Sequence, residues 1–120
     1  KDMTVIPSCV YTDPEIACAG FTADEAKAAG IDTATGKYIM SVNGKSVLSM
    51  QDRGFLKIVS EKETGRILGA QLMCARATDM IGELELAISK RLTAEDLAAV
   101  IMPHPTFCEG IGEAAESILM

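Results

Sequence analysis

GFLKIVSEKETGRILGAQLM, residues 54–73, is the segment that decides the fold. Residues 55–59 and 66–73 are two runs rich in apolar and β-branched side chains, and the polar residues 61–65 join them over a length typical of hairpins. The segment therefore predicts two antiparallel strands. Gly69 lies inside the second run, and a glycine within a strand indicates either a bulge or another stretch of backbone that approaches closely.

The residues nearer the N-terminus predict a strand and a short helix. Val5–Tyr11 is rich in apolar and β-branched residues, and the turn-forming Asp-Pro pair at positions 13–14 ends it. A helix is expected over Ala23–Ala29, because Thr22 can cap its first turn while Glu25 reaches back in a capping box. Gly30 then supplies a left-handed terminator.

A second strand is predicted directly before the hairpin. Lys37–Val42 alternates polar with apolar residues, which is typical of a strand with one buried face. Asn43 and Gly44 follow it, and this pair can adopt the positive φ angles of a tight turn. We therefore expect the strand to end in a turn at these two residues.

The residues after the hairpin predict three helices. Thr78–Lys90 places apolar side chains at steps of three and four residues on one face. Thr93 with Asp96 forms a second capping pattern, so a helix is expected from there to about Val100, and a last one over Gly110–Leu119. Strands come first and helices after, which indicates an α+β fold, an antiparallel sheet covered by helices.

Composition limits the classes of partner. A chain of 120 residues, 48% of them hydrophobic, suits one domain with a single core. Its formal net charge of −6 argues against nucleic acid and anionic membranes. No apolar run approaches the roughly 20 residues that span a bilayer. The four cysteines show no C-x-x-C spacing, so we expect free thiols in a cytoplasmic protein. The carboxylates are scattered along the chain, so no metal site is predicted.

The segment PHPTFCE, residues 103–109, contains the single histidine of the chain. The imidazole of His104 can accept or donate a proton near neutral pH, and a carboxylate such as Glu109 can fix its tautomer and stabilise the imidazolium. The two residues could form a catalytic pair. A histidine that merely caps a helix or lies in a surface loop fits the same spacing, and the spacing does not decide between the two.

Four blocks in order along the chain resemble the C-terminal interface domain of dihydrolipoamide dehydrogenases, which are class I pyridine nucleotide-disulfide oxidoreductases. They are residues 6–17, similar to P-S-x-x-Y-T-x-P-E-x-A; residues 54–59 with 65–69, similar to G-F-x-K and G-x-I-L-G; residues 77–87 with 92–97, similar to the helix pair before the family's histidine; and residues 104–109, similar to H-P-T-x-x-E. The resemblance covers nearly the whole chain.

The resemblance implies a shared active site in a homodimer. In this family the histidine reaches across a two-fold axis to the partner subunit's flavin and redox-active dithiol, so His104 would act as acid and base there and Glu109 would orient it. His104 and Pro105 would lie near the partner's flavin, and the bond between them would be cis. FAD and NAD are the implied cofactors of the full-length enzyme, and a lipoyl-bearing acyltransferase of a 2-oxo acid dehydrogenase complex is the implied partner.

Several features of the family are missing or altered here. No two cysteines are spaced as the family's C-x-x-x-x-C dithiol. Residues 1–120 are therefore expected to be a dimerisation domain, a fragment of a longer chain. By itself this fragment is expected to be inactive and to bind no cofactor. Cys108, where relatives often have Ser, is expected to be a packing residue. Residues 110–115 match a G-x-G-x-x-A dinucleotide fingerprint, but they follow a proline-rich loop instead of a strand, so no nucleotide site is predicted.

Two other hypotheses stay open at this point. The chain could belong to a glutathione-reductase-like enzyme, which shares H-P-T with a nearby Glu, or it could be purely an oligomerisation module with a structural histidine. If the parent protein is dimeric through this face, the apolar helical segments Ile81–Ile88 and Ile111–Leu119 are expected to pair across a self-complementary two-fold interface.

Overall fold

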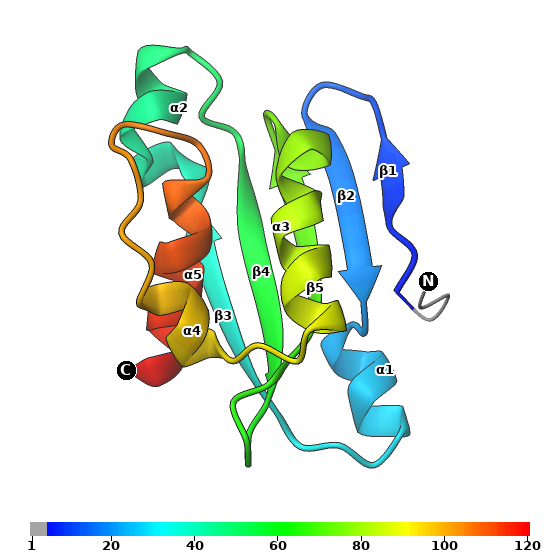
Figure 1. Cartoon of the computed structure of the whole chain (residues 1–120). Helices are drawn as coiled ribbons and strands as arrows, with labels where there is room; N and C mark the ends of the chain where they lie inside the picture. Colours follow the sequence, from blue (N-terminus) through cyan, green and yellow to red (C-terminus); the bar gives the residue numbers. More distant parts are fainter. Residues whose placement is uncertain (1–4) are drawn as a thin grey trace.

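The computed structural model describes residues 5–120 and shows one antiparallel sheet with helices packed on it (Figure 1). The sheet has five strands in the order β1-β2-β5-β4-β3. The strands are β1 (Ser8–Val10), β2 (Glu15–Gly20), β3 (Thr33–Ile39), β4 (Gly54–Glu61) and β5 (Ile67–Cys74). This architecture confirms the predicted α+β fold with an antiparallel sheet covered by helices.

Helices cover the sheet mainly on one face. The helices are α1 (Ala23–Ala28), η1 (Met40–Val42, a single 3₁₀ turn), α2 (Gly44–Leu48), α3 (Ala77–Ser89), α4 (Ala94–Ala98) and α5 (Glu109–Leu119). Helix α3 packs on β2 and β5, whereas α5 packs on β3 and β4 and is flanked by α4. Both predicted capping boxes are present, Thr22 with Glu25 at α1 and Thr93 with Asp96 at α4. Gly30 has the expected left-handed conformation, with φ of 81°.

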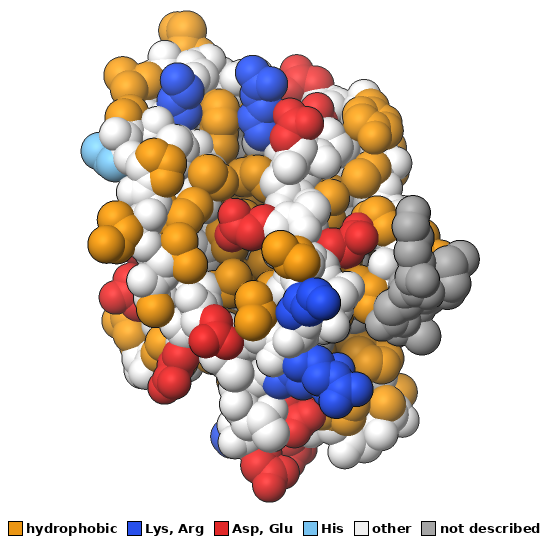
Figure 2. Space-filling model, viewed as in Figure 1, with side chains coloured by type: hydrophobic (Ala, Val, Ile, Leu, Met, Phe, Trp, Pro, Cys, Tyr) orange, Lys and Arg blue, Asp and Glu red, His pale blue; other side chains and the backbone are white. Residues whose placement is uncertain are grey.

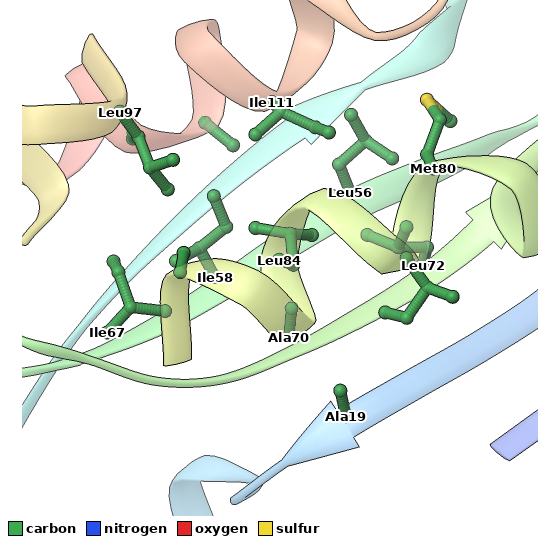
Figure 3. Close-up of a cluster of buried hydrophobic side chains, with 14 of the residues drawn as sticks. Ala19, Leu56, Ile58, Ile67, Ala70, Leu72, Met80, Leu84, Leu97 and Ile111 are labelled. Carbon is green, nitrogen blue, oxygen red and sulfur yellow. The ribbon is translucent and has the colours of Figure 1, made fainter. Parts of the chain in front are cut away.

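The central hairpin of β4 and β5 divides the apolar side chains between two sides of the sheet. Leu56, Ile58 and Leu72 point towards α3 and α5, where they meet Leu84 and Ile111 in the main core (Figure 3). These five side chains are fully or almost fully buried. A smaller cluster on the other side joins β4 and β5 to α1, because alternate residues of a strand face opposite ways.

Gly69 meets both expectations for a glycine within a strand. The register between β4 and β5 shifts at Val59 and Ser60, opposite Gly69, so a bulge is present. A Cβ atom on Gly69 would also collide with the backbone of Phe21, whose N–H donates to the carbonyl of Leu68 at 3.0 Å. The absence of a side chain therefore lets the connection between β2 and α1 cross the start of β5.

The N-terminal third differs from the prediction in three places. The first strand covers only Ser8–Val10 of the predicted Val5–Tyr11, and β2 was not predicted at all. Its sequence, EIACAG, has a single β-branched residue, Ile16, among mostly small ones, so its pairing with β5 specifies the strand instead. The strand predicted over Lys37–Val42 begins at Thr33 and ends at Ile39, before the 3₁₀ turn η1.

The tight turn predicted at Asn43 and Gly44 is wrong. Asn43 has φ of −83° and caps helix α2, with its side-chain oxygen accepting from the backbone N–H of Ser46. Asparagine has a strong preference for this position because its carbonyl satisfies a free N–H of the first turn. A short helix between the strands replaces the expected turn.

Candidate functional site

His104 and Glu109 form a hydrogen-bonded pair at one end of the sheet. The imidazole Nδ1 lies 2.9 Å from Glu109 Oε1 and 3.1 Å from Glu109 Oε2. The imidazole side chain is 75% exposed, whereas that of Glu109 is only 20% exposed. Within residues 5–120 no hydrogen bond engages Nε2. The carboxylate therefore occupies the nitrogen on the protein side and leaves the other nitrogen available to an external proton donor or acceptor.

Thr106 holds the loop that positions this pair. Its backbone N–H donates to Glu109 Oε2 at 3.1 Å, and its hydroxyl accepts from the backbone N–H of Glu109 at 3.2 Å. The same hydroxyl donates to the carbonyl of Pro103 at 2.8 Å. The bond between His104 and Pro105 is cis, as expected. The carboxylate of Glu109 is thus fixed by the backbone before it meets the imidazole.

Asn43 connects this loop to the remainder of the fold, and the sequence analysis missed it. Its side chain is fully buried, and its Nδ2 donates to the carbonyl of Thr106 at 3.1 Å. Its Oδ1 accepts from Ser46 N at 2.9 Å and from Ser46 Oγ at 2.7 Å. An Asn followed three residues later by Ser is compatible with a helix N-cap, but nothing in the sequence links position 43 to position 106.

The electrostatic surroundings of the pair are acidic. A shallow hollow of about 250 Å³ beside the loop is lined by His104, Glu109, Glu113 and Glu116. Burial raises the pKa of the nearby Tyr38 phenol, and the carboxylates of Glu113 and Glu109 raise it further, whereas a hydrogen bond to Asn43 lowers it. The pair thus lies in acidic surroundings, with Glu109 on Nδ1 and Nε2 left as the atom that can exchange a proton with an external group.

The remaining predicted residues occupy structural positions. Cys108 packs against the core, and its Sγ lies 3.5 Å from Thr106 Oγ1, which agrees with a packing role. All four cysteines are free. Gly110 lies inside α5, where a Cβ would crowd Leu56 and Tyr38, so helix packing explains the first glycine of the fingerprint-like segment.

The hollow beside His104 is too small to enclose a flavin nucleotide, because sites that enclose a drug-sized ligand typically measure roughly 300–1,000 Å³. The exposed His104 and Pro105 can only form part of the wall of such a site. In the described part of the chain, no three His, Cys, Asp or Glu side chains are grouped to hold a metal ion. None of the described helices is long and apolar enough to span a bilayer.

Comparison with known proteins identifies the family. Residues 6–115 match the pyridine nucleotide-disulphide oxidoreductase dimerisation domain. Dihydrolipoyl dehydrogenases from Geobacillus stearothermophilus and Halobacterium salinarum are 45% and 40% identical over 118 residues, which is 98% of this chain but 25% of each relative.

Solved structures agree with that assignment. A TM-score of 0.88 relates the chain to LpdA from Mycobacterium tuberculosis, with 28% identity over 96% of this chain and 25% of that one. The HOCl-induced flavoprotein disulfide reductase RclA from Escherichia coli has a TM-score of 0.91 at 24% identity, over 96% of this chain and 26% of its own, which shows the shared fold. The chain therefore belongs to the pyridine nucleotide-disulphide oxidoreductase family, as its dimerisation domain.

Proposed function

We propose that residues 1–120 are the C-terminal dimerisation domain of a longer, FAD- and NAD-dependent dihydrolipoyl dehydrogenase, and that His104 and Glu109 act in the partner subunit's dithiol site. The hydrogen-bonded pair with its exposed Nε2 is the observation that supports this role most strongly. The chain spans about a quarter of the length of the dihydrolipoyl dehydrogenases that it matches, so the flavin and the dithiol would come from outside it.

His104 would work as the acid and base of thiol–disulfide exchange. The thiolate is the nucleophile in such exchange, and a free thiol is mostly protonated at pH 7. Nε2 of His104 would take the proton of a dihydrolipoyl thiol, while Glu109 at 2.9 Å from Nδ1 stabilises the resulting imidazolium. The bound flavin would supply the route by which electrons pass from the dithiol to NAD.

The homodimer would form through the helical side of the domain. Figure 2 shows apolar side chains along the depression between α5 and α3. The side chains of Ile81, Leu84 and Ile88 in α3 are buried within the domain itself. The predicted pairing of helices would therefore depend on apolar side chains of α3 and α5 that point outward. Leu86 and Leu119 are 58% and 48% exposed and are available for such a contact.

The substrate assignment rests on the relatives. Those named above are dihydrolipoyl dehydrogenases at 40% and 45% identity, and this supports dihydrolipoamide over a glutathione-like disulfide. A lipoyl-bearing acyltransferase of a 2-oxo acid dehydrogenase complex is the corresponding partner. Purified residues 1–120 alone should show no lipoamide turnover. Measurable turnover would contradict the proposal that the flavin and the dithiol come from outside this chain.

His104→Gln in the full-length protein tests the proposal against a purely architectural domain. Glutamine approximates the size of imidazole but cannot serve as a base. We expect dihydrolipoamide oxidation to fall by at least about 100-fold, within the range that general acid–base catalysis contributes. Gel filtration should show an unchanged dimer. Undiminished turnover would show that the histidine is structural.

A further inference from the structure

At the end of the sheet away from His104, a hollow of about 430 Å³ opens between β2, β5, α1 and α3. The strand register places it there, because Gly20 and Gly69 are paired at this end, whereas Glu15 and Cys74 are paired at the other. Arg66 and Arg91 both line the hollow.

These two arginines differ from the other two in the chain. Arg53 pairs with Asp13 at 3.5 Å, and Arg76 pairs with Asp79 at 3.7 Å. Among residues 5–120 no carboxylate lies within 4.0 Å of the guanidinium of Arg66 or Arg91. Acidic residues outnumber basic ones by 17 to 11 in this chain, so a shortage of carboxylates does not explain why neither arginine has an ionic partner among residues 5–120.

Arg66 also has an unsatisfied donor. Its Nε is the one buried side-chain nitrogen or oxygen in the described residues without a hydrogen-bond partner. A buried donor without an acceptor costs about 1–3 kcal/mol, and more when the group is charged, so such groups are rare without a function. An anion in the hollow would bring acceptor oxygens to this guanidinium.

The backbone holds both arginines in place. The carbonyl of Arg66 accepts from Glu61 N at 2.8 Å within the hairpin, and the N–H of Arg66 donates to Thr64 Oγ1 at 3.2 Å. Arg91 adopts a left-handed conformation, with φ of 57°, after α3, and its N–H donates to the carbonyl of Ile88 at 3.1 Å. These bonds fix the backbone of both residues, so two arginine side chains start from defined positions on one hollow, and guanidinium groups are well suited to bind an oxyanion.

The other walls indicate what else the ligand must have. Phe21, Ile67 and Ile88 contribute apolar surface, Ser89 adds a hydroxyl, and Glu25 adds one carboxylate that already caps α1. The arginines thus leave a net positive charge in a hollow large enough for more than a bare ion. We propose that this hollow binds a small organic anion, a phosphate or carboxylate group joined to an apolar body, with the guanidinium groups on its oxygens and the body against Phe21.

NMR titration of the ¹⁵N-labelled chain with phenyl phosphate, benzoate and benzyl alcohol tests the proposal. The two anions distinguish phosphate from carboxylate, and the alcohol keeps the ring but lacks the charge. We expect saturable shifts of the Arg66 Nε–Hε signal with at least one anion, at an affinity at least about tenfold above that for benzyl alcohol. Equal affinity for the alcohol, or no saturable shift with either anion, would overturn the site.

Variants show whether the arginines are responsible. Arg66→Gln and Arg91→Gln should each weaken binding of the preferred anion by about tenfold or more. Lys90→Gln is the matched control, because it removes the same charge one residue away from Arg91 but outside the hollow, and it should change binding less than about twofold. Arg91 is exposed, so its replacement should leave the fold intact even if that of Arg66 does not. Unchanged binding by Arg91→Gln would contradict the proposal.

Discussion

Asn43→Ala should destabilise the domain and loosen the loop that holds His104. Besides the hydrogen bond to Tyr38, the substitution removes three others, two in which Oδ1 accepts from Ser46 and one in which Nδ2 donates to the carbonyl of Thr106. Each bond contributes about 0.5–1.5 kcal/mol net, and the fully buried Ser46 loses its partner, as does the half-buried Thr106. We therefore expect the free energy of unfolding to fall by roughly 2–4 kcal/mol.

Urea unfolding followed by circular dichroism measures this loss. Ser46→Ala is the matched control, because it removes only the hydroxyl's 2.7 Å bond to Asn43 and should cost less, about 0.5–1.5 kcal/mol. The amide signals of Thr106 and Glu109 should shift in NMR spectra of Asn43→Ala and stay closer to their original positions in Ser46→Ala. A loss below about 0.5 kcal/mol for Asn43→Ala, or unmoved loop signals, would refute the role of this side chain as the anchor of the loop.

Three further outcomes follow from the geometry. Glu109→Gln in the full-length protein should lower kcat/KM for dihydrolipoamide by about 12- to 150-fold, because a charge-assisted hydrogen bond to His104 contributes about 1.5–3 kcal/mol; a loss under twofold would contradict that role. Gly69→Ala should lower the urea midpoint substantially, since its Cβ would collide with the backbone of Phe21, and an unchanged midpoint would show that this crossing is loose. Burial raises the pKa of Cys74 to about 12, so this thiol should resist a thiol reagent at pH 8 until urea unfolds the chain; rapid labelling of folded Cys74, mapped by mass spectrometry, would contradict its burial.

The parts of the fold with strong local signals could be predicted from the sequence. The hairpin of β4 and β5, the helix α3 and both capping boxes depend on residues close together in the chain. Strand β2 could not be found in this way, because EIACAG has little intrinsic strand preference and is specified by pairing with β5, about 50 residues later. Strand β1 is short for the related reason that its only strand partner is β2.

In the site, too, contacts between residues close in sequence could be predicted and contacts between distant residues could not. His104 and Glu109 are five residues apart, so the sequence could suggest the pair, although the spacing alone did not decide against a structural histidine. Asn43 could not be assigned to the site, because 63 residues separate it from Thr106 and an Asn-Gly pair most readily suggests a turn. The hollow between Arg66 and Arg91 depends in the same way on how the ends of separate elements meet.

Mixed dimers of the full-length protein test most directly whether His104 acts across the subunit interface. One subunit would have His104→Gln and an intact dithiol, and the other an intact His104 and a dithiol inactivated by Cys→Ser changes. Differently tagged subunits allow the heterodimer to be isolated and its dihydrolipoamide oxidation measured. If His104 completes the partner's site, each mutant homodimer is nearly inactive but the heterodimer retains one whole site and about half of the unmodified activity per dimer. A heterodimer as inactive as both parents would contradict that account.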